Sequence, residues 1–413
     1  KPSIDVAKRL FKQKKYEIAI NTSKKILAQG NNSIEALKII AKSSIAINKN
    51  DDARLYLKKI IQIAPHDCEA LKDLGNSYQA EGDINNAKEY YKKAISINNS
   101  YAPALANLGS LELKAGKKEE ALILLKKAIE SDPQLYPSWI HLANCYLQNG
   151  QLNKASYACH KAIESNPNLF NAHFLLGNIY IVSKELEKAE QSLLKTIKIN
   201  PDFVQAYINL SKVLRDLGRL EEASEACRNA IIINPNLYNS HLLLANNLIL
   251  MNQLQEAVKP LLKVIKIEPN CYEAYVNIAT ILRETGQQSK AEIYIRKAIE
   301  LKPDLPENYN NLGNILKDLG SYQKAQLAYQ EAIRINPKFF KAHLNLGMLF
   351  NEIGKLKEAE KSTRKAIEYR SNYAEAYYNL GNILRDLGNY KEAEIYTCKA
   401  IEVRPDYKEA YLN

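Results

Sequence analysis

The chain is built from one pattern, which is clearest at residues 374–407 in the stretch AEAYYNLGNILRDLGNYKEAEIYTCKAIEVRPDY. The first part of this stretch carries apolar or small residues at the i, i+3, i+4 and i+7 spacing of one helical face, namely Tyr377, Leu380, Gly381 and Leu384. Gly388 interrupts this first helix, and a second amphipathic run follows. Pro405 closes the second run, because proline cannot continue a helix. The stretch therefore predicts two short helices joined by a turn.

The pattern recurs every 34 residues without insertion or deletion when units are counted from residues 34, 68, 102 and so on to 408. The twentieth place of the unit is alanine in all twelve units, from Ala19 to Ala393, and the eighth place always holds Gly, Ala or Ser. Small residues at these two places let two helices approach closely. We therefore expect each unit to be a tight helical hairpin.

This period, with its alanine and its closing proline, resembles the tetratricopeptide repeat (TPR) family over essentially the whole chain. The resemblance implies an all-α fold, an α-solenoid of about twelve helix–turn–helix units in a right-handed superhelix. Residues 1–67 would hold two divergent units, residues 68–407 ten regular ones, and residues 408–413 the start of a further, truncated unit. Glycine marks the turn inside most units, and Lys184 and Asn252 substitute for it in two of them.

The formal net charge of +11 is concentrated at the N-terminus, where residues 1–33 hold eight basic and two acidic residues. The remaining charge is interleaved, so we expect no nucleic-acid binding. No apolar run approaches the length of a membrane span, and we expect no membrane insertion.

The six cysteines show no CxxC spacing, and Cys159 and Cys227 fall at helix-packing places. Scattered free thiols favour a reducing compartment such as the cytoplasm.

No catalytic or metal-binding motif is evident in the sequence. Histidine takes the fourth place, otherwise aromatic, at His173, His241 and His343, and these residues are too far apart to share a metal. There is no nucleophile elbow, phosphate-binding glycine loop or HExxH motif. We expect no enzyme activity, no metal and no cofactor in this segment. Pro260 lies within a second helix, where it removes a backbone donor and is expected to cause a local kink.

The TPR resemblance implies that first helices line a concave groove and that places two, five, six, nine, twelve and thirteen face it. Asparagine fills the sixth place at Asn107, Asn209, Asn277, Asn311, Asn345, Asn379 and Asn413. Asparagine also fills the ninth place at Asn76, Asn144, Asn178, Asn246, Asn314 and Asn382. The twelfth place is basic, and the thirteenth acidic, in the units of Arg215, Arg283, Lys317 and Arg385. This combination is similar to the repeat arm of O-linked N-acetylglucosamine transferases, whose asparagine ladder holds peptide backbone.

A ladder of primary amides suits peptide binding, because each amide can pair with both the N–H and the C=O of an extended chain. The alternative is that these asparagines only hydrogen-bond neighbouring helices or lie on a solvated face. The ladder is interrupted by apolar residues at groove-facing places, namely Phe174, Leu175, Ile181, Leu242, Leu243 and Ile249. This apolar patch would be a hydrophobic anchor for a partner, a subunit contact, or tight local packing.

We interpret the segment as a non-catalytic scaffold that binds a protein or peptide in its concave groove. The alternative is the substrate-recognition arm of a larger glycosyltransferase-like or other transferase enzyme. The chain opens on Lys1 rather than Met, and residues 408–413 begin a unit without capping it, so we expect a fragment or a further domain. A structural spacer or a homo-oligomer is a third interpretation.

Overall fold

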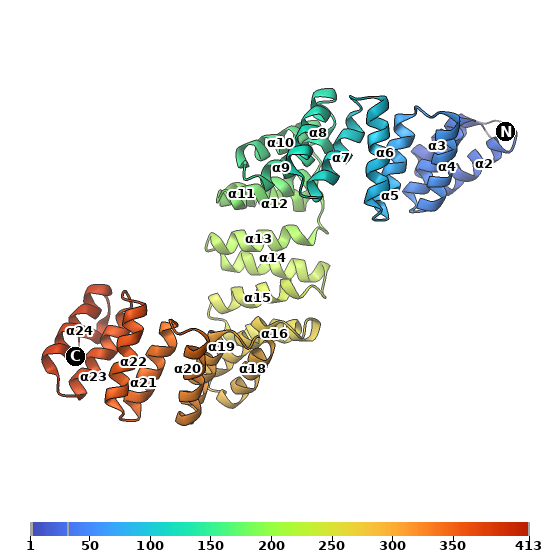
Figure 1. Ribbon diagram of the computed structural model, residues 1–413. Coiled ribbons are helices and arrows are strands. Elements are labelled where there is room, and N and C mark those ends of the chain that lie inside the picture. Colours follow the sequence, from blue (N-terminus) through green and yellow to red (C-terminus); the bar gives the residue numbers. More distant parts are fainter. Residues whose placement is uncertain (1–2, 31–32, 412–413) are drawn as a thin grey trace. The chain divides into compact units, whose positions relative to one another are not determined.

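The computed structural model describes residues 3–30 and 33–411, and these residues form helices joined by short turns, with no strand among them (Figure 1). The chain divides into two compact units. Residues 1–217 make up the N-terminal unit and residues 218–413 the C-terminal unit. Each unit is described by itself.

The helices of both units are short and of regular length. The N-terminal unit contains α1 (Ile4–Lys12), α2 (Tyr16–Leu27), α3 (Ile34–Ala46), α4 (Asn50–Ile63), α5 (Cys68–Ala80), α6 (Ile84–Ile97), α7 (Ala102–Lys114), α8 (Lys118–Ser131), α9 (Tyr136–Gln148), α10 (Leu152–Ser165), α11 (Phe170–Val182), α12 (Leu186–Ile199) and α13 (Val204–Asp216). The C-terminal unit contains α14 (Leu220–Ile233), α15 (Tyr238–Leu250), α16 (Leu254–Ile267), α17 (Tyr272–Glu284), α18 (Gln288–Leu301), α19 (Pro306–Asp318), α20 (Tyr322–Ile335), α21 (Phe340–Glu352), α22 (Leu356–Tyr369), α23 (Ala374–Asp386), α24 (Tyr390–Val403) and α25 (Lys408–Tyr411).

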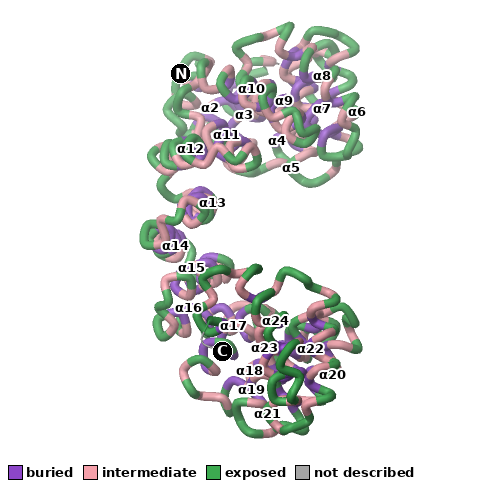
Figure 2. Tube along the Cα trace, turned by 90° about the vertical axis from the view of Figure 1, so that its left-hand side faces the viewer, coloured by how far each residue is buried: buried purple, intermediate pink, exposed green. Residues whose placement is uncertain are grey.

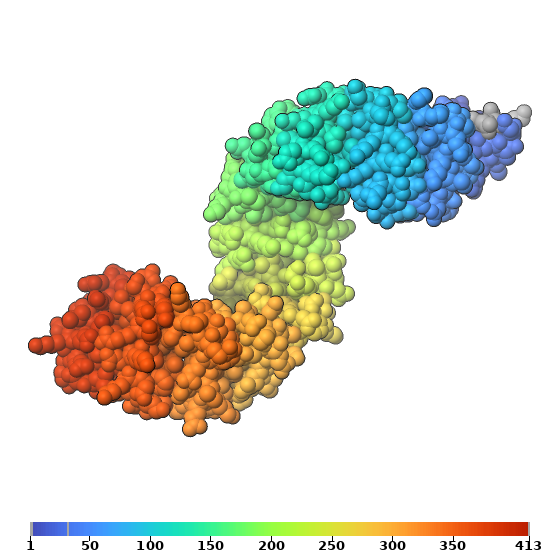
Figure 3. Space-filling model, viewed as in Figure 1, coloured from blue at the N-terminus to red at the C-terminus, as the bar shows by residue number. Residues whose placement is uncertain are grey.

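The predicted 34-residue register is confirmed by the helix bounds. From α3 to α24 every first helix occupies places 1–13 of its repeat and every second helix places 17–30. Second helices end two residues before the closing proline, as Val403 does before Pro405, because the residue preceding proline disfavours helical backbone. Within each unit helices contact mainly their neighbours in the sequence, and the space-filling view shows the chain as successive bands of colour (Figure 3).

Close packing inside each hairpin confirms the role of the small residues. Gly75, at the eighth place of α5, faces the fully buried ring of Tyr91 in α6, and a Cβ added to Gly75 would lie 2.5 Å from that ring. A Cβ on Gly347 would lie 3.1 Å from the carbonyl oxygen of Ala359 at the twentieth place. Buried residues accordingly lie where helices face one another (Figure 2).

The turn inside each hairpin requires a left-handed backbone at the fifteenth place. Gly388 has φ of 82°, and the two substitutes named from the sequence, Lys184 and Asn252, have φ of 60° and 58°. Lys14 and Asn48 adopt the same conformation in the first two repeats. Since side chains with a Cβ disfavour this region, these four turns carry local strain that glycine avoids.

The fourth place of a first helix ties consecutive repeats together. The ring nitrogen Nε2 of His241 lies 2.9 Å from the carbonyl oxygen of Pro235, six residues earlier, and His343 makes the same contact with Pro337 at 2.8 Å. Trp139 donates from its indole nitrogen to the carbonyl of Pro133 at 2.8 Å. The prediction that these histidines stand in for aromatic packing residues agrees with this shared position.

The core contains the two cysteines that the sequence assigned to helix-packing places. Cys159 and Cys227 are fully buried, and burial raises the pKa of the Cys159 thiol to about 12, so it stays protonated. The α16 helix continues through Pro260. Among the described residues no group of three or more His, Cys, Asp or Glu side chains could hold a metal ion. No described helix combines the length and the apolar character that crossing a bilayer requires.

Candidate peptide-binding surface

Asparagines of consecutive first helices pair with each other in the N-terminal unit. The side-chain nitrogen of Asn107 in α7 donates to the side-chain oxygen of Asn76 in α5 at 2.7 Å. Asn209 in α13 donates in the same way to Asn178 in α11 at 2.8 Å. Both pairs join the sixth place of one repeat to the ninth place of the repeat before it. The amides therefore form links between repeats, as the alternative interpretation of the ladder expected.

The C-terminal unit repeats this arrangement with one variation. Asn277 in α17 donates to Asn246 in α15 at 3.0 Å. Asn345 in α21 donates instead to Asn310, at the fifth place of α19, at 2.9 Å. The oxygen of Asn314, which would have been the partner by analogy, accepts from the hydroxyl of Tyr329 at 2.8 Å.

Pairing leaves hydrogen-bonding capacity on each amide. Asn107 uses one of its two N–H groups on Asn76, so its other N–H and its oxygen remain. The oxygen of Asn76 also accepts from the hydroxyl of Tyr91 at 2.7 Å, which occupies both lone pairs but neither of its N–H donors. All these asparagines are half-buried, apart from buried Asn310, and their amide planes are held by the pairing.

Two sixth-place asparagines lack the partner that the others have. Asn311 in α19 would pair with the ninth place of α17, which is Thr280, and the Thr280 hydroxyl donates to the carbonyl of Val276 at 3.0 Å. Asn379 in α23 would pair with the ninth place of α21, which is Met348. Within the described residues neither Asn311 nor Asn379 makes a side-chain hydrogen bond, and both are half-buried.

The basic residues at the twelfth place form ion pairs along the same face. The side-chain nitrogen Nε of Arg283 lies 2.5 Å from a carboxylate oxygen of Asp318, at the thirteenth place of the next repeat. Lys317 approaches Glu352 of the following repeat at 3.8 Å. Arg215 and Arg385 each lie 3.7 Å from the acidic residue that follows them in the sequence.

Asn382 and Arg385 line a shallow hollow of about 250 Å³ between α23 and α24. Asn413, the last member of the predicted ladder, lies outside the described residues.

A charged network that was not singled out from the sequence joins the second and third repeats. The amino group of Lys38 lies 2.7 Å from a carboxylate oxygen of Asp67 and 3.1 Å from one of Glu69, and Lys42 lies 2.7 Å from Glu69. The hydrogen bond from Lys42 is the main reason that the pKa of Glu69 falls to about 2, and Lys38 adds to it. These lysines occupy the fifth and ninth places, which both belong to the places expected to face the groove, so counting charged residues at those places would have found them.

His141 stands at the sixth place of α9, where other repeats have asparagine. Burial, followed by the nearby charge of Lys114, lowers the pKa of His141 to about 4. The imidazole is therefore neutral at physiological pH. The ladder of the N-terminal unit is thus interrupted here by an uncharged ring.

The predicted apolar patch is distributed over both units. Leu175 in α11 and Leu243 in α15 are buried in the helical core, which agrees with local packing. The ring of Phe174 packs edge-on against Phe203 at a centroid distance of 4.9 Å. The other three members, Ile181, Leu242 and Ile249, are half-buried. Phe174 and Ile181 belong to the N-terminal unit, and Leu242 and Ile249 to the C-terminal unit.

Comparison with known protein families agrees with this geometry. Models of the tetratricopeptide repeat match residues 69–101, 294–327, 313–354, 347–388 and 374–407. A model described as the cilia and flagella-associated protein 70 C-terminal domain matches residues 99–308, about half of the chain. The chain belongs to the tetratricopeptide repeat family. TPR proteins bind protein or peptide partners, so this TPR chain is a protein-interaction scaffold.

Solved structures resemble this TPR chain over different lengths. The APC/C hetero-tetramer Cut9–Hcn1 is 13% identical with a TM-score of 0.50, and the match covers 98% of this chain and 94% of that one, which shows the shared fold. MamA is 25% identical over 39% of this chain and 95% of its own, with a TM-score of 0.37. YrrB, described as a TPR protein with an unusual peptide-binding site, is 24% identical over 46% of this chain and 97% of its own, with a TM-score of 0.37. No curated protein matches the chain.

Proposed function

We propose that this TPR chain binds an extended polypeptide along its first helices, with asparagine amides holding the backbone of the ligand. The observation that carries the proposal is the state of Asn311 and Asn379. A half-buried amide without a protein partner is costly unless water or a ligand satisfies it. Each of these amides offers two donors and an acceptor, the set that a passing peptide group needs.

The spacing of the amides fits a ligand in extended conformation. Adjacent packed helices lie roughly 10 Å apart, and an extended peptide advances about 3.3 Å per residue. One amide therefore meets about every third residue of the ligand. Because the contacts are to backbone, binding tolerates many ligand sequences.

The charged residues beside the amides would add preference. Arg283 and Lys317 already pair with Asp318 and Glu352, so a ligand side chain must compete with an exposed ion pair. Exposed pairs contribute about 0.2–1 kcal/mol, which a ligand charge can replace. We therefore expect weak selection by side-chain charge on top of backbone binding. The segment would act without catalysis of its own.

Backbone recognition is tested by peptides selected on an array of random sequences and resynthesised with a fluorescent label. The double variant Asn311→Ala, Asn379→Ala should weaken binding about tenfold in a polarisation titration, because two hydrogen bonds to the ligand are lost. Asn389, an exposed asparagine in the turn before α24, provides the matched control as Asn389→Ala. Methylating ligand backbone nitrogens should abolish binding, whereas exchanging ligand side chains should not. Equal affinity for the double variant and the control would refute the proposal.

A second candidate is that the same surface delivers substrate to a transferase domain of the same polypeptide. It rests on the similarity of the asparagine pattern to the repeat arm of O-linked N-acetylglucosamine transferases. The two proposed functions predict different intact masses for the native protein isolated from its source cell. A mass well above 46.8 kDa would support the transferase arm.

A further inference from the structure

A cleft of about 1040 Å³ opens in the C-terminal unit, where side chains of α14, α15 and α16 line one hollow. Its apolar lining consists of Ile231, Ile232, Leu244, Leu248, Pro260 and Leu262. The corresponding hollow of α20, α21 and α22 has about 490 Å³, and that of α4, α5 and α6 about 440 Å³. The cleft is therefore about twice the size of its counterparts.

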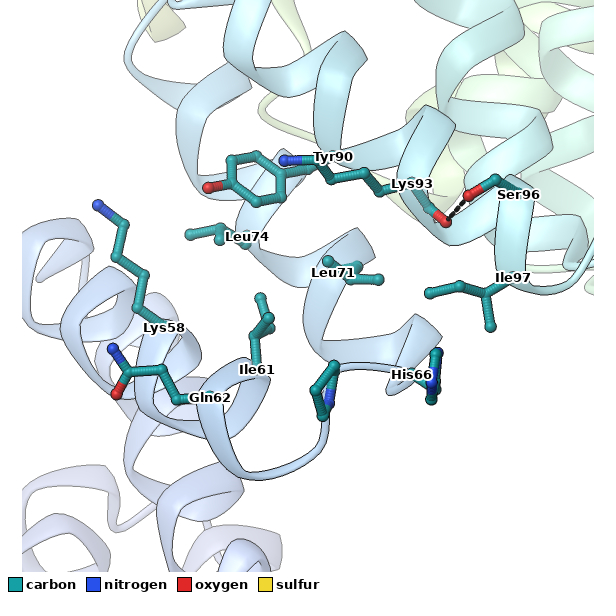
Figure 4. A pocket seen from close by; sticks show the side chains of 11 residues that line it. Lys58, Ile61, Gln62, His66, Leu71, Leu74, Tyr90, Lys93, Ser96 and Ile97 are labelled. Atoms are coloured by element: carbon teal, nitrogen blue, oxygen red, sulfur yellow. Dashed lines mark hydrogen bonds between the residues drawn. The ribbon is translucent and has the colours of Figure 1, made fainter.

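Pro260 lies in the lining of this cleft. It occupies the twenty-third place of its repeat, where four other repeats have a tyrosine and the repeat of the α20–α22 hollow has Ser362. Tyr90 lines the smaller hollow of the N-terminal unit (Figure 4). Its ring also stacks on that of Tyr78 at a centroid distance of 5.6 Å. Tyr294 packs near Tyr275 at 6.3 Å in the repeat after the cleft. Because the ring of Pro260 is shorter than a tyrosine side chain, a tyrosine at this place is expected to reach into the cleft.

The cleft presents apolar side chains to solvent on two walls. Ile232 in α14 is 75% exposed and Leu262 in α16 is 44% exposed. Leu244 and Leu248 come from α15 below them. His241 also lines the cleft, with its Nε2 atom held 2.9 Å from the carbonyl oxygen of Pro235. Exposed apolar side chains around a concave floor are typical of a site that an apolar ligand group covers.

The rim of the cleft is basic. Lys259, Lys263 and Lys266 follow one another at i, i+4 and i+7 along α16, and Arg228 faces the cleft from α14. Glu256 is the one carboxylate among the described lining residues, and Arg228 also lies 3.3 Å from Glu225. None of the three lysines forms an ion pair with a carboxylate in the part of the chain that the structure describes. The positive charge around the apolar floor is therefore largely uncompensated.

We propose that this cleft binds an acidic amphipathic helix of a partner protein. Apolar side chains on one face of the helix would lie between Ile232 and Leu262, and its carboxylates would meet the lysines. The three lysines span two turns of α16, about 10 Å, which matches the spacing of carboxylates on a ligand helix. The cleft is formed mainly by second helices, so it is independent of the asparagines on first helices.

Pro260→Tyr is the decisive variant. It places in α16 the residue that α18 and α24 have at the same place, and it restores a backbone N–H to the helix interior. We expect an unchanged or higher melting temperature together with a filled cleft. Loss of binding in this variant would then report the cleft and not the fold.

The probe is a phage-displayed library of random peptides, about 14 residues long to allow four helical turns. Clones are selected on the wild-type chain and tested on Pro260→Tyr and on Asn311→Ala, Asn379→Ala. We expect clones that bind the asparagine variant but not Pro260→Tyr, and that combine Asp or Glu with apolar residues at helical spacing. A selection without clones that distinguish wild type from Pro260→Tyr would overturn the proposal, as would cleft-dependent clones that are neutral or basic.

The role of charge is tested with one selected peptide in a polarisation titration. Lys259→Glu with Lys263→Glu should weaken binding at least tenfold, and added salt should weaken binding to the wild type. The matched control is Lys361→Glu with Lys365→Glu, a charge reversal at the same two places in α22. Equal losses in both double variants would show that net charge, and not the cleft, attracts the peptide. If Pro260→Tyr should prove unstable, this pair of variants decides the proposal.

Discussion

The side-chain nitrogen of Asn277 donates to the side-chain oxygen of Asn246, which lies 3.0 Å away and 31 residues earlier in the sequence. The same bond joins Asn107 to Asn76 and Asn209 to Asn178. Sixth-place asparagines are therefore of two kinds: those that link repeats and those, such as Asn311, that do not. The two kinds differ in what their removal should change.

Asn277→Ala should lower the free energy of unfolding by about 1 kcal/mol, because the partly buried oxygen of Asn246 loses its donor. Asn311→Ala should leave the free energy of unfolding unchanged within about 0.5 kcal/mol. Urea titration followed by circular dichroism measures both. A reversed order of the two effects would show that the link between repeats does not contribute to stability.

Gly75→Ala should destabilise the chain by about 1–3 kcal/mol, because the new Cβ would overlap the ring of Tyr91. The repeat before it combines Ala41 with Leu57 at the same two places. The double variant Gly75→Ala, Tyr91→Leu should therefore recover part of the lost stability. Additive losses in a double-mutant cycle would mean that the two positions do not contact each other.

Lys184→Gly should stabilise the chain by about 1 kcal/mol, because Lys184 has φ of 60° and glycine adopts this conformation without a steric penalty. Asn252→Gly should gain less, because asparagine tolerates the left-handed region better than lysine does. Thermal and urea unfolding of the two variants provide the comparison. A loss of stability in Lys184→Gly would indicate that the lysine side chain makes a contribution that outweighs the strain.

His141 should make stability depend on pH. Its pKa falls from an ordinary 6.5 to about 4 in the folded chain, so between these values the unfolded state binds more protons. Burial of the neutral His141 ring therefore makes the free energy of unfolding depend on pH. The stability is complete above pH 6.5 and decreases by roughly 3 kcal/mol in all as the pH falls toward 4. His141→Asn should remove this part of the pH dependence. A His141 NMR signal that titrates near 6.5 would contradict the argument.

The repeats were readable from the sequence because their main determinants are local. Ala393, Gly388 and Pro405 each act within one hairpin through close packing, a left-handed turn or helix termination. The substitutes Lys184 and Asn252 were found because the register shows where glycine is missing. The right-handed superhelix stays a prediction, since it concerns the arrangement of all repeats together.

The details of the candidate surfaces depend on contacts between repeats, and these were not readable in the same way. The sequence showed asparagines at the sixth and ninth places, but not that Asn107 reaches Asn76 of the preceding repeat. Pro260 was singled out in the sequence for the backbone donor that it lacks, but the sequence did not show that it lines a cleft bounded by three helices. Such volumes follow from side chains far apart in the sequence.

The constant helix bounds from α3 to α24 also determine how the chain can change in length. Removing residues 272–305, which comprise α17, α18 and their turns, would join the thirty-fourth place of one repeat to the first place of another. Every new junction would have the geometry of an existing one, because neighbouring helices supply most of the contacts within each unit. Gain or loss of a whole repeat is therefore a step that preserves the fold and alters only the number of amides and clefts it displays.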